Sequence, residues 1–198
     1  MTPVITGLSK LVSCDLDKDI SRMNEQIRHM RFVHDLEKLV VTAVGLVLYD
    51  AGMSFPVGNE DIGLYVEVDN AIEDIKSEYF NNILSEGILG ASPLLFPFTS
   101  PNALTAQATI AFDIRGESIT LPIQRSSKDV IEYATDCIIG RYTKMAIAGG
   151  ITTDRSQTSC SETIKAPVYM AEFFFLEDRK SAVERGVKVY HCVMDGSI

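Results

Sequence analysis

Apolar and polar residues alternate along the chain in two periods, one typical of helices and the other of strands. Over residues 36–48 the apolar positions recur every three or four residues, which predicts a helix with one buried face. Asp35 is placed to cap the start of this helix and Gly52 to end it. Residues 61–68 form a short run rich in β-branched and aromatic side chains, which favours a buried strand.

The same patterns continue over the rest of the chain. Helices are expected over residues 72–84, 102–112, 128–138 and 178–185, and strands over residues 3–7, 119–121, 145–150, 168–176 and 188–193. Pro93, Pro97 and Pro101 exclude a regular helix just before residue 102. A Ser/Thr-rich stretch over residues 151–165 is expected to be an exposed loop. Strands that alternate with helices indicate an α/β fold, a layered mixed sheet with helices on its faces and antiparallel pairing at its end.

Composition limits the class of protein. A chain of 198 residues that is 46% hydrophobic fits a single domain over residues 1–198. The apolar runs are too short or too interrupted by charge to span a bilayer, and we expect a cytoplasmic protein. A formal net charge of −9 argues against nucleic-acid binding. The same charge disfavours an acidic carrier protein as partner, unless Arg22, Arg28 and Arg31 gather on one face.

The cysteines and histidines do not form a metal-binding pattern. The four cysteines are Cys14, Cys137, Cys160 and Cys192. None of them forms a CxxC pair, and the three histidines do not join them in a zinc-like spacing. We therefore expect reduced thiols packed as small apolar residues, and neither a metal nor a cofactor.

Several segments resemble, in order, the N-terminal half of the β-ketoacyl synthases, which belong to the thiolase-like group. Residues 4–8 (VITGL) are similar to the opening strand of that family, and residues 49–53 (YDAGM) to the end of its first long helix. The most specific match is SPLLFP at residues 92–97 followed by PNA at residues 101–103, because several prolines and an asparagine must agree in spacing. The segments AIAGG, FFLED and RGVKVY are similar to later strands of the family. The resemblance implies half of a thiolase-like fold.

One departure from the family concerns its nucleophile. In the family a cysteine stands just before a Ser-Ser or Ser-Gly pair that opens a buried helix, whose N-terminus lowers the pKa of the thiol. Counting back from Ser126 and Ser127 places Gln124 at that position. An amide is not nucleophilic enough to accept an acyl group, so the resemblance implies that this protein is not an enzyme. Glutamine at this position is also similar to the chain-length factors, the inactive partners of certain polyketide synthases.

A second departure is length, because we expect the chain to lack the half that carries the two catalytic histidines and the lysine of the family. The first hypothesis is therefore a non-catalytic accessory or structural protein of fatty-acid or polyketide biosynthesis. An alternative is half of a split acyltransferase completed by a second polypeptide. A third is a binding module that holds an acyl chain or carrier protein without reacting with it.

The resemblance also implies an interface. The family dimerises edge to edge through the strand that corresponds here to Ser118, Ile119, Thr120 and Leu121. We therefore expect a homodimer or a heterodimer with a ketosynthase, with acyl carrier protein as a further candidate partner. In the helix after Gln124 we expect Cys137 to be a buried thiol rather than a displaced nucleophile. Tyr133 and Arg125 either line an acyl pocket or make surface contacts.

Overall fold

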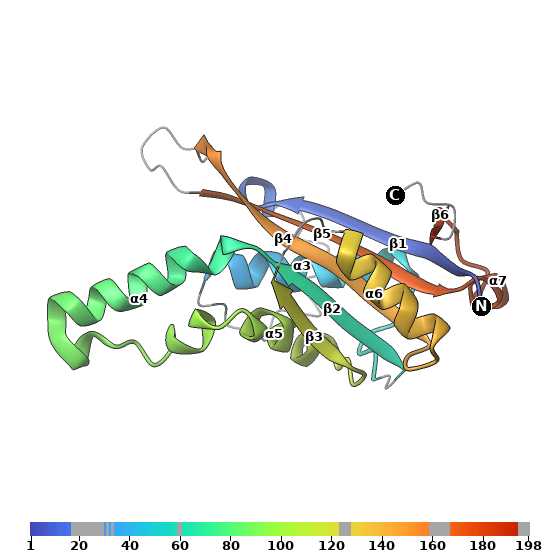
Figure 1. Ribbon diagram of the computed structural model, residues 1–198, viewed down its shortest axis with the longest axis horizontal. Helices are drawn as coiled ribbons and strands as arrows, with labels where there is room; N and C mark the ends of the chain where they lie inside the picture. The colour runs from blue at the N-terminus through green and yellow to red at the C-terminus, as the bar shows by residue number, and fades with distance from the viewer. Residues whose placement is uncertain are drawn as a thin grey trace.

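The computed structural model describes residues 1–16, 30, 32, 34–58, 61–122, 128–158 and 167–193. Their strands form one mixed sheet in the order β3-β2-β4-β5-β1-β6 (Figure 1). The strands are β1 (Pro3–Val12), β2 (Ile62–Val68), β3 (Ser118–Pro122), β4 (Met145–Thr158), β5 (Pro167–Asp178) and β6 (His191–Cys192). Strand β2 runs parallel to β3 and β4, whereas β5 is antiparallel to β4 and β1, and β6 is antiparallel to β1.

Helices cover both faces of this sheet. They are α3 (Asp35–Asp50), α4 (Glu73–Glu86), α5 (Asn102–Phe112), α6 (Lys128–Ile139) and α7 (Arg179–Arg185). Helices α3 and α5 share a core with one face, while α6 packs on the opposite face (Figure 1). The expected α/β fold, a layered mixed sheet with helices on its faces, is confirmed.

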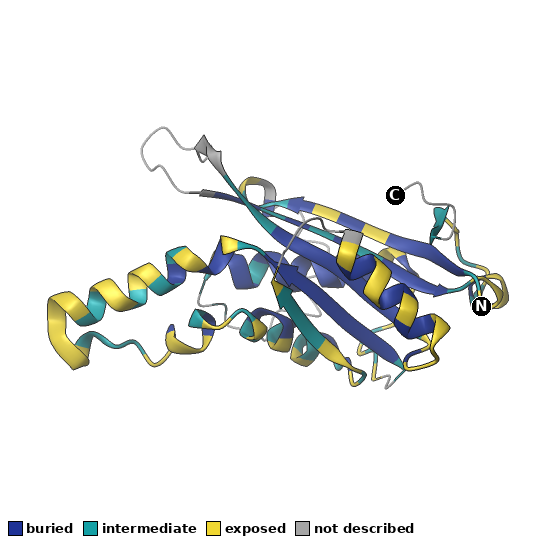
Figure 2. Cartoon of the chain, viewed as in Figure 1, coloured by how far each residue is buried: buried dark blue, intermediate teal, exposed yellow. Residues whose placement is uncertain are grey.

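The two faces bury different kinds of side chain. On the α3 side a large aliphatic and aromatic cluster fills the space, and α3 is buried along most of its length. On the other side α6 buries only its inner face, against small residues of β4 such as Ala146 and Ala148 (Figure 2). Because β2 has helices over both faces, all of its residues are buried, which explains its nearly continuous apolar sequence.

The first strand and the first long helix differ from the sequence prediction. Strand β1 continues through Gly7 instead of turning there, with a register shift between Ile5 and Gly7. A Cβ at Gly7 would lie 2.7 Å from the carbonyl oxygen of Val47, so the glycine permits close approach of α3. The cap of α3 is His34, whose Nδ1 accepts a hydrogen bond from the Leu36 backbone N–H at 3.0 Å, and not Asp35.

Two further expectations need correction near the end of the chain. Residues 151–158 belong to β4 and not to a loop, because they continue the ladder with β5. The remainder of that expected loop, residues 159–165, lies outside the described residues. The last strand is also shorter than residues 188–193, since only His191–Cys192 pair with β1.

An arm formed by residues 73–99 projects from the sheet (Figures 1 and 2). It contains α4 and the 3-10 turns Gly87–Gly90 and Phe96–Thr99, as the prolines before residue 102 lead one to expect. Helix α4 buries only Ile75, and the ring of Tyr79 contacts the rings of Phe80 and Phe96. The arm exposes six large apolar side chains, Phe80, Leu84, Ile88, Leu89, Leu94 and Phe96.

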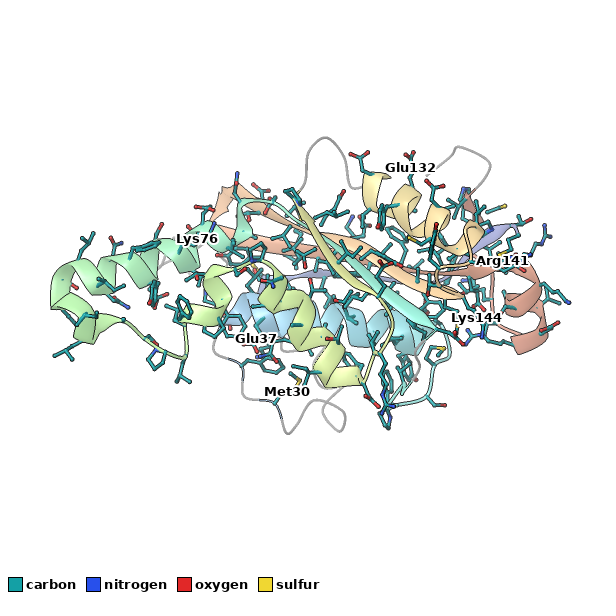
Figure 3. The ribbon with its side chains drawn as sticks, turned by 60° about the horizontal axis from the view of Figure 1, so that its bottom comes forward. Met30, Glu37, Lys76, Glu132, Arg141 and Lys144 are labelled. Atoms are coloured by element: carbon teal, nitrogen blue, oxygen red, sulfur yellow. The ribbon has the colours of Figure 1, made fainter. Side chains whose placement is uncertain are left out.

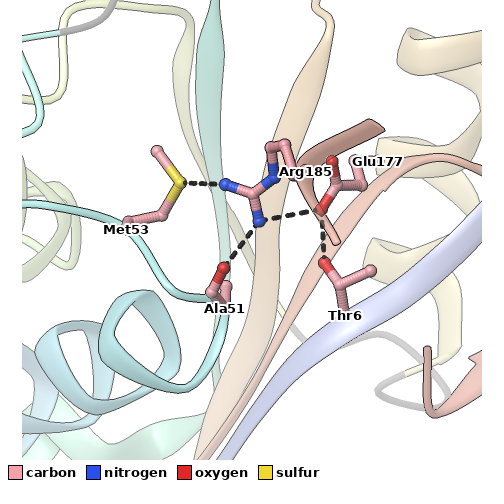
Figure 4. A network of polar contacts seen from close by, with 5 residues as sticks. All are labelled: Thr6, Ala51, Met53, Glu177 and Arg185. Carbon is pink, nitrogen blue, oxygen red and sulfur yellow. Dashed lines mark hydrogen bonds and ion pairs between the residues drawn. The ribbon is translucent and has the colours of Figure 1, made fainter. Parts of the chain in front are cut away.

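A buried polar network fastens α7 to the body of the protein (Figure 4). Arg185 Nη2 donates to Glu177 Oε1 at 3.1 Å and to the carbonyl oxygen of Ala51 at 2.6 Å. Thr6 Oγ1 donates to the same Glu177 oxygen at 2.7 Å. Glu177 is fully buried, so its charge depends on these donors. The network joins α7, β5 and β1 to the end of α3.

Candidate functional site

Gln124, the residue at the expected nucleophile position, lies outside the described residues, as do Arg125, Ser126 and Ser127. The described residues on either side are Pro122, the last of β3, and Lys128, the first of α6. The expected basic patch of Arg22, Arg28 and Arg31 also lies outside the described residues. The roles assigned to these residues therefore stay predictions.

A buried carboxyl group that the sequence analysis missed lies at the N-terminal end of α6. Glu67 of β2 is 2% exposed, and its Oε2 has no hydrogen-bond partner. Burial raises the pKa of Glu67 above its usual value, and the charge of Asp129 raises it further, while a hydrogen bond from the Val130 N–H opposes both. A charged residue inside the apolar run of β2 was the signal in the sequence.

Glu67 starts a polar row on the α6 side of the sheet. It pairs with Gly150 of β4, which pairs with Glu172 of β5, which in turn pairs with Lys10 of β1. Lys10 Nζ lies 3.4 Å from Glu172 Oε1. A cavity of about 90 Å³ lies along this row, lined by residues that include Lys10, Gly150 and Glu172. Its size suits water or a small ion better than an acyl chain.

Cys137 is buried on the apolar face of α6, as expected. Burial raises the pKa of its thiol and the charges of Glu117 and Asp136 raise it further, while the nearby hydroxyl groups of Tyr65 and Tyr133 oppose the shift. A thiol with a raised pKa and little access to solvent is a poor nucleophile. Tyr133 is partly exposed, and its ring meets the ring of Tyr65 edge to face at 5.5 Å.

A second, larger cavity of about 290 Å³ opens beside the C-terminal half of α6. We call it the tyrosine cavity, and its lining residues are Glu117, Tyr133, Asp136, Cys137 and Tyr142. Tyr65 donates from its hydroxyl group to Glu117 Oε2 at 2.9 Å. The expected role of Tyr133 as a lining residue of a pocket is thus compatible with the structure, but the lining is acidic and aromatic rather than aliphatic.

The expected interface strand, Ser118 to Leu121, falls in β3 at one edge of the described sheet. Its backbone pairs with β2 from Leu64↔Ser118 to Val68↔Pro122, and no described strand lies on its outer side. Thr120 Oγ1 lies 2.6 Å from Thr105 Oγ1 of α5, which fixes the strand against that helix. The position of β3 permits edge-to-edge pairing, and the pairing itself stays a prediction.

Within the part of the chain that the structure describes, no three His, Cys, Asp or Glu side chains are arranged to hold a metal ion. No helix among the described residues is long and apolar enough to cross a bilayer. The three described cysteines, Cys14, Cys137 and Cys192, are free thiols.

The arrangement of this sheet and its helices is similar to part of several solved ketosynthase and chain length factor structures. No protein-family model and no curated protein matches the sequence. Among solved structures, the ishigamide ketosynthase/chain length factor matches 95% of this chain with a TM-score of 0.71 and 15% identity. A type II polyketide ketosynthase in complex with its acyl-carrier protein matches 95% with a TM-score of 0.68 and 18% identity.

A β-ketoacyl synthase from Burkholderia phymatum STM815 is also similar, with a TM-score of 0.64 and 15% identity over 95% of this chain. The chain spans 61%, 66% and 62% of the lengths of these three structures, less than two thirds of each. At such identities the similarity shows the fold, and the fold is ketosynthase-like, as the sequence resemblance implied.

Proposed function

We propose that this protein is a non-catalytic ketosynthase-like protein that acts in polyketide or fatty-acid biosynthesis by pairing with a ketosynthase or with a second copy of itself. The observation that carries the proposal is the outer edge of β3, with which no described strand pairs, in a fold similar to part of a ketosynthase/chain length factor. An unpaired edge strand presents a row of backbone donors and acceptors to another chain.

The absence of catalysis is supported by the residues around the expected nucleophile position. Gln124 cannot carry an acyl group as a thioester. Cys137, the cysteine in the helix that follows, is buried with a raised thiol pKa and is directed into the core. Neither residue provides the exposed thiolate that acyl transfer requires.

Pairing is supported by the arm as well as by β3. Leu84, Ile88 and Leu89 are each at least 83% exposed, and three more large apolar side chains share the arm. Large apolar side chains gathered at the surface are typical of interaction sites, so these exposed residues favour a partner. The arm and β3 both lie along the lower side of the molecule in Figure 1.

The proposal is tested by measuring the mass of the purified protein in solution, alone and after co-expression with ketosynthases of its own genome. A double variant, Ser118→Lys with Leu89→Lys, places charges on the edge strand and on the arm, where both side chains are exposed. The matched control is Val183→Lys with Val189→Lys, which adds the same charge at exposed positions away from β3 and the arm.

We expect a dimer or a defined complex for the native protein and the control, and a monomer for the double variant. A native monomer that forms no complex with any ketosynthase refutes pairing. Condensation activity in a complex that depends on this chain refutes the non-catalytic role and favours a split acyltransferase. Acyl carrier protein belongs in the same co-expression panel, because one similar structure contains such a protein bound to its ketosynthase.

A further inference from the structure

The tyrosine cavity has no part in the proposed pairing chemistry, yet it gathers unusual groups. Two carboxyl groups, those of Glu117 and Asp136, line it together with the rings of Tyr133 and Tyr142. Neither carboxyl group forms an ion pair with a described cation. Lys144, two residues after Tyr142, is held by Asp61 Oδ2 at 2.6 Å, and Arg115, two residues before Glu117, is held by Asp113.

Two glycines leave room for the rings of Tyr142 and Tyr65 near this cavity. A Cβ at Gly140 would lie 2.7 Å from Tyr142 Cε2, and a Cβ at Gly63 would lie 2.7 Å from the Tyr65 hydroxyl oxygen. The ring of Tyr142 therefore lies against Gly140 on one side, although the residue as a whole is 83% exposed. The backbone N–H of Tyr142 donates to the Cys137 carbonyl oxygen at 2.9 Å, which holds this residue at the end of α6.

The chemistry of these walls selects the charge of a ligand. Aromatic ring faces and carboxylates both attract cations, and both repel anions. The thiol of Cys137 is neutral because burial raises its pKa, so it adds no competing charge. A metal ion would need more ligands than the described residues provide. A cavity of about 290 Å³ suits a small group and not an extended acyl chain.

We propose that the tyrosine cavity binds an organic cation, an ammonium or guanidinium group, between the carboxylates of Glu117 and Asp136 and the rings of Tyr133 and Tyr142. A free amine binds at this site whether or not the proposed pairing occurs, whereas a side chain of a partner binds only if the pairing occurs. The cation belongs either to a free small amine or to a Lys or Arg side chain of a chain paired at β3, because Glu117 directly precedes β3.

The experiment is calorimetric titration of the full chain with n-butylammonium and methylguanidinium. Butan-1-ol serves as the neutral probe, since it matches n-butylammonium in shape without the charge. The variants are Asp136→Asn, Glu117→Gln and Tyr142→Leu, all at exposed positions, and the glutamine amide keeps an oxygen that can accept the hydrogen bond of Tyr65. The matched control is Glu132→Gln, an exposed carboxylate on the outer side of the same helix (Figure 3).

We expect saturable binding of both cations and none of butan-1-ol. Loss of one carboxylate weakens binding by about two- to fivefold, as expected for an exposed ion pair. Loss of the Tyr142 ring weakens it by about two- to fivefold. Glu132→Gln leaves the affinity unchanged, because its carboxylate does not line the cavity.

The source of the cation is separated by a second measurement on the same variants. If the natural ligand is a free amine, Glu117→Gln lowers the affinity for the probe cations and leaves the mass of any complex unchanged. If the ligand is a side chain of the partner, the same variant also lowers the fraction of protein found in the complex. The proposal is overturned if butan-1-ol binds as well as n-butylammonium, or if Glu132→Gln costs as much as Asp136→Asn. No saturable heat up to about 10 mM of either cation overturns it as well.

Discussion

Replacing Arg185 by methionine tests whether the buried polar network in Figure 4 holds the sheet, α3 and α7 together. Methionine keeps most of the length of the side chain and removes its charge. Glu177, which is fully buried, then retains only the Thr6 hydroxyl as a donor. Removing one partner of a buried ion pair costs about 3–5 kcal/mol, because the remaining charge is left without compensation.

The structure places the cost of breaking this ion pair at the lower end of that range. The Arg185 side chain is 26% exposed, so water reaches part of the network. Loss of the hydrogen bond to the Ala51 carbonyl oxygen adds about 1 kcal/mol. We therefore expect the Arg185→Met variant to lose roughly 4 kcal/mol of the free energy of unfolding, a large part of the stability of a single domain.

The assay is urea unfolding followed by far-ultraviolet circular dichroism, with linear extrapolation to water. The control, Arg179→Met, removes an exposed arginine at the start of the same helix and is expected to change stability by less than about 0.5 kcal/mol. A double variant, Arg185→Met with Glu177→Leu, removes both charges and should recover most of the loss. A double variant that is as unstable as the sum of its two single variants would show that the pair is not coupled, and would refute the reasoning.

Three further predictions follow from single residues. Gly7→Ala should cost about 1–3 kcal/mol of the free energy of unfolding, because its Cβ would lie 2.7 Å from the α3 backbone. Gly150→Ala, whose Cβ would have its nearest contact at 3.5 Å, should cost far less, and urea unfolding of the two variants measures the difference. The pKa of Glu67 is raised in the folded protein, so its contribution to the free energy of unfolding is complete below the ordinary pKa of 4.5 and is lost as the pH rises through the folded-state pKa. Urea unfolding from pH 4 upward should therefore show a loss of stability with rising pH that is smaller in the Glu67→Gln variant. In the native protein a thiol reagent should modify the exposed Cys14 faster than the buried Cys137. Peptide mapping by mass spectrometry measures the two rates separately, and equal rates would contradict the burial of Cys137.

The periodicity of apolar residues predicted most elements because burial on a sheet face or under a helix is a local pattern. The predicted helix over residues 102–112 coincides with α5, and the strand over residues 61–68 with β2. The pattern failed where polar chain continues a ladder, as in residues 151–158, since backbone pairing with β5 needs no apolar side chains. It also misread Gly7, whose role is close approach to α3 rather than a turn.

Features that depend on contacts between distant residues were beyond sequence reasoning. The Arg185 network joins Thr6, Glu177 and the end of α3, which are far apart in the chain. The tyrosine cavity is lined by Glu117 and by residues of α6, and the hydroxyl group of Tyr65 donates a hydrogen bond to Glu117. The position of β3 at the sheet edge was implied by the family resemblance alone, because an edge strand and a central strand can have similar sequences.

The two edges of the sheet differ in a way that bears on the proposed pairing. At the β1 edge the chain pairs some of its own backbone groups, since the Leu8 N–H donates to Asp50 Oδ2 at 2.9 Å and the Tyr190 N–H donates to the Ile5 carbonyl oxygen at 2.8 Å. The short strand β6 pairs there as well. At the β3 edge no described strand pairs with the outer side. Because proteins cover or pair their open edges, the β3 edge, on which no described strand lies, is the one that favours the proposed association.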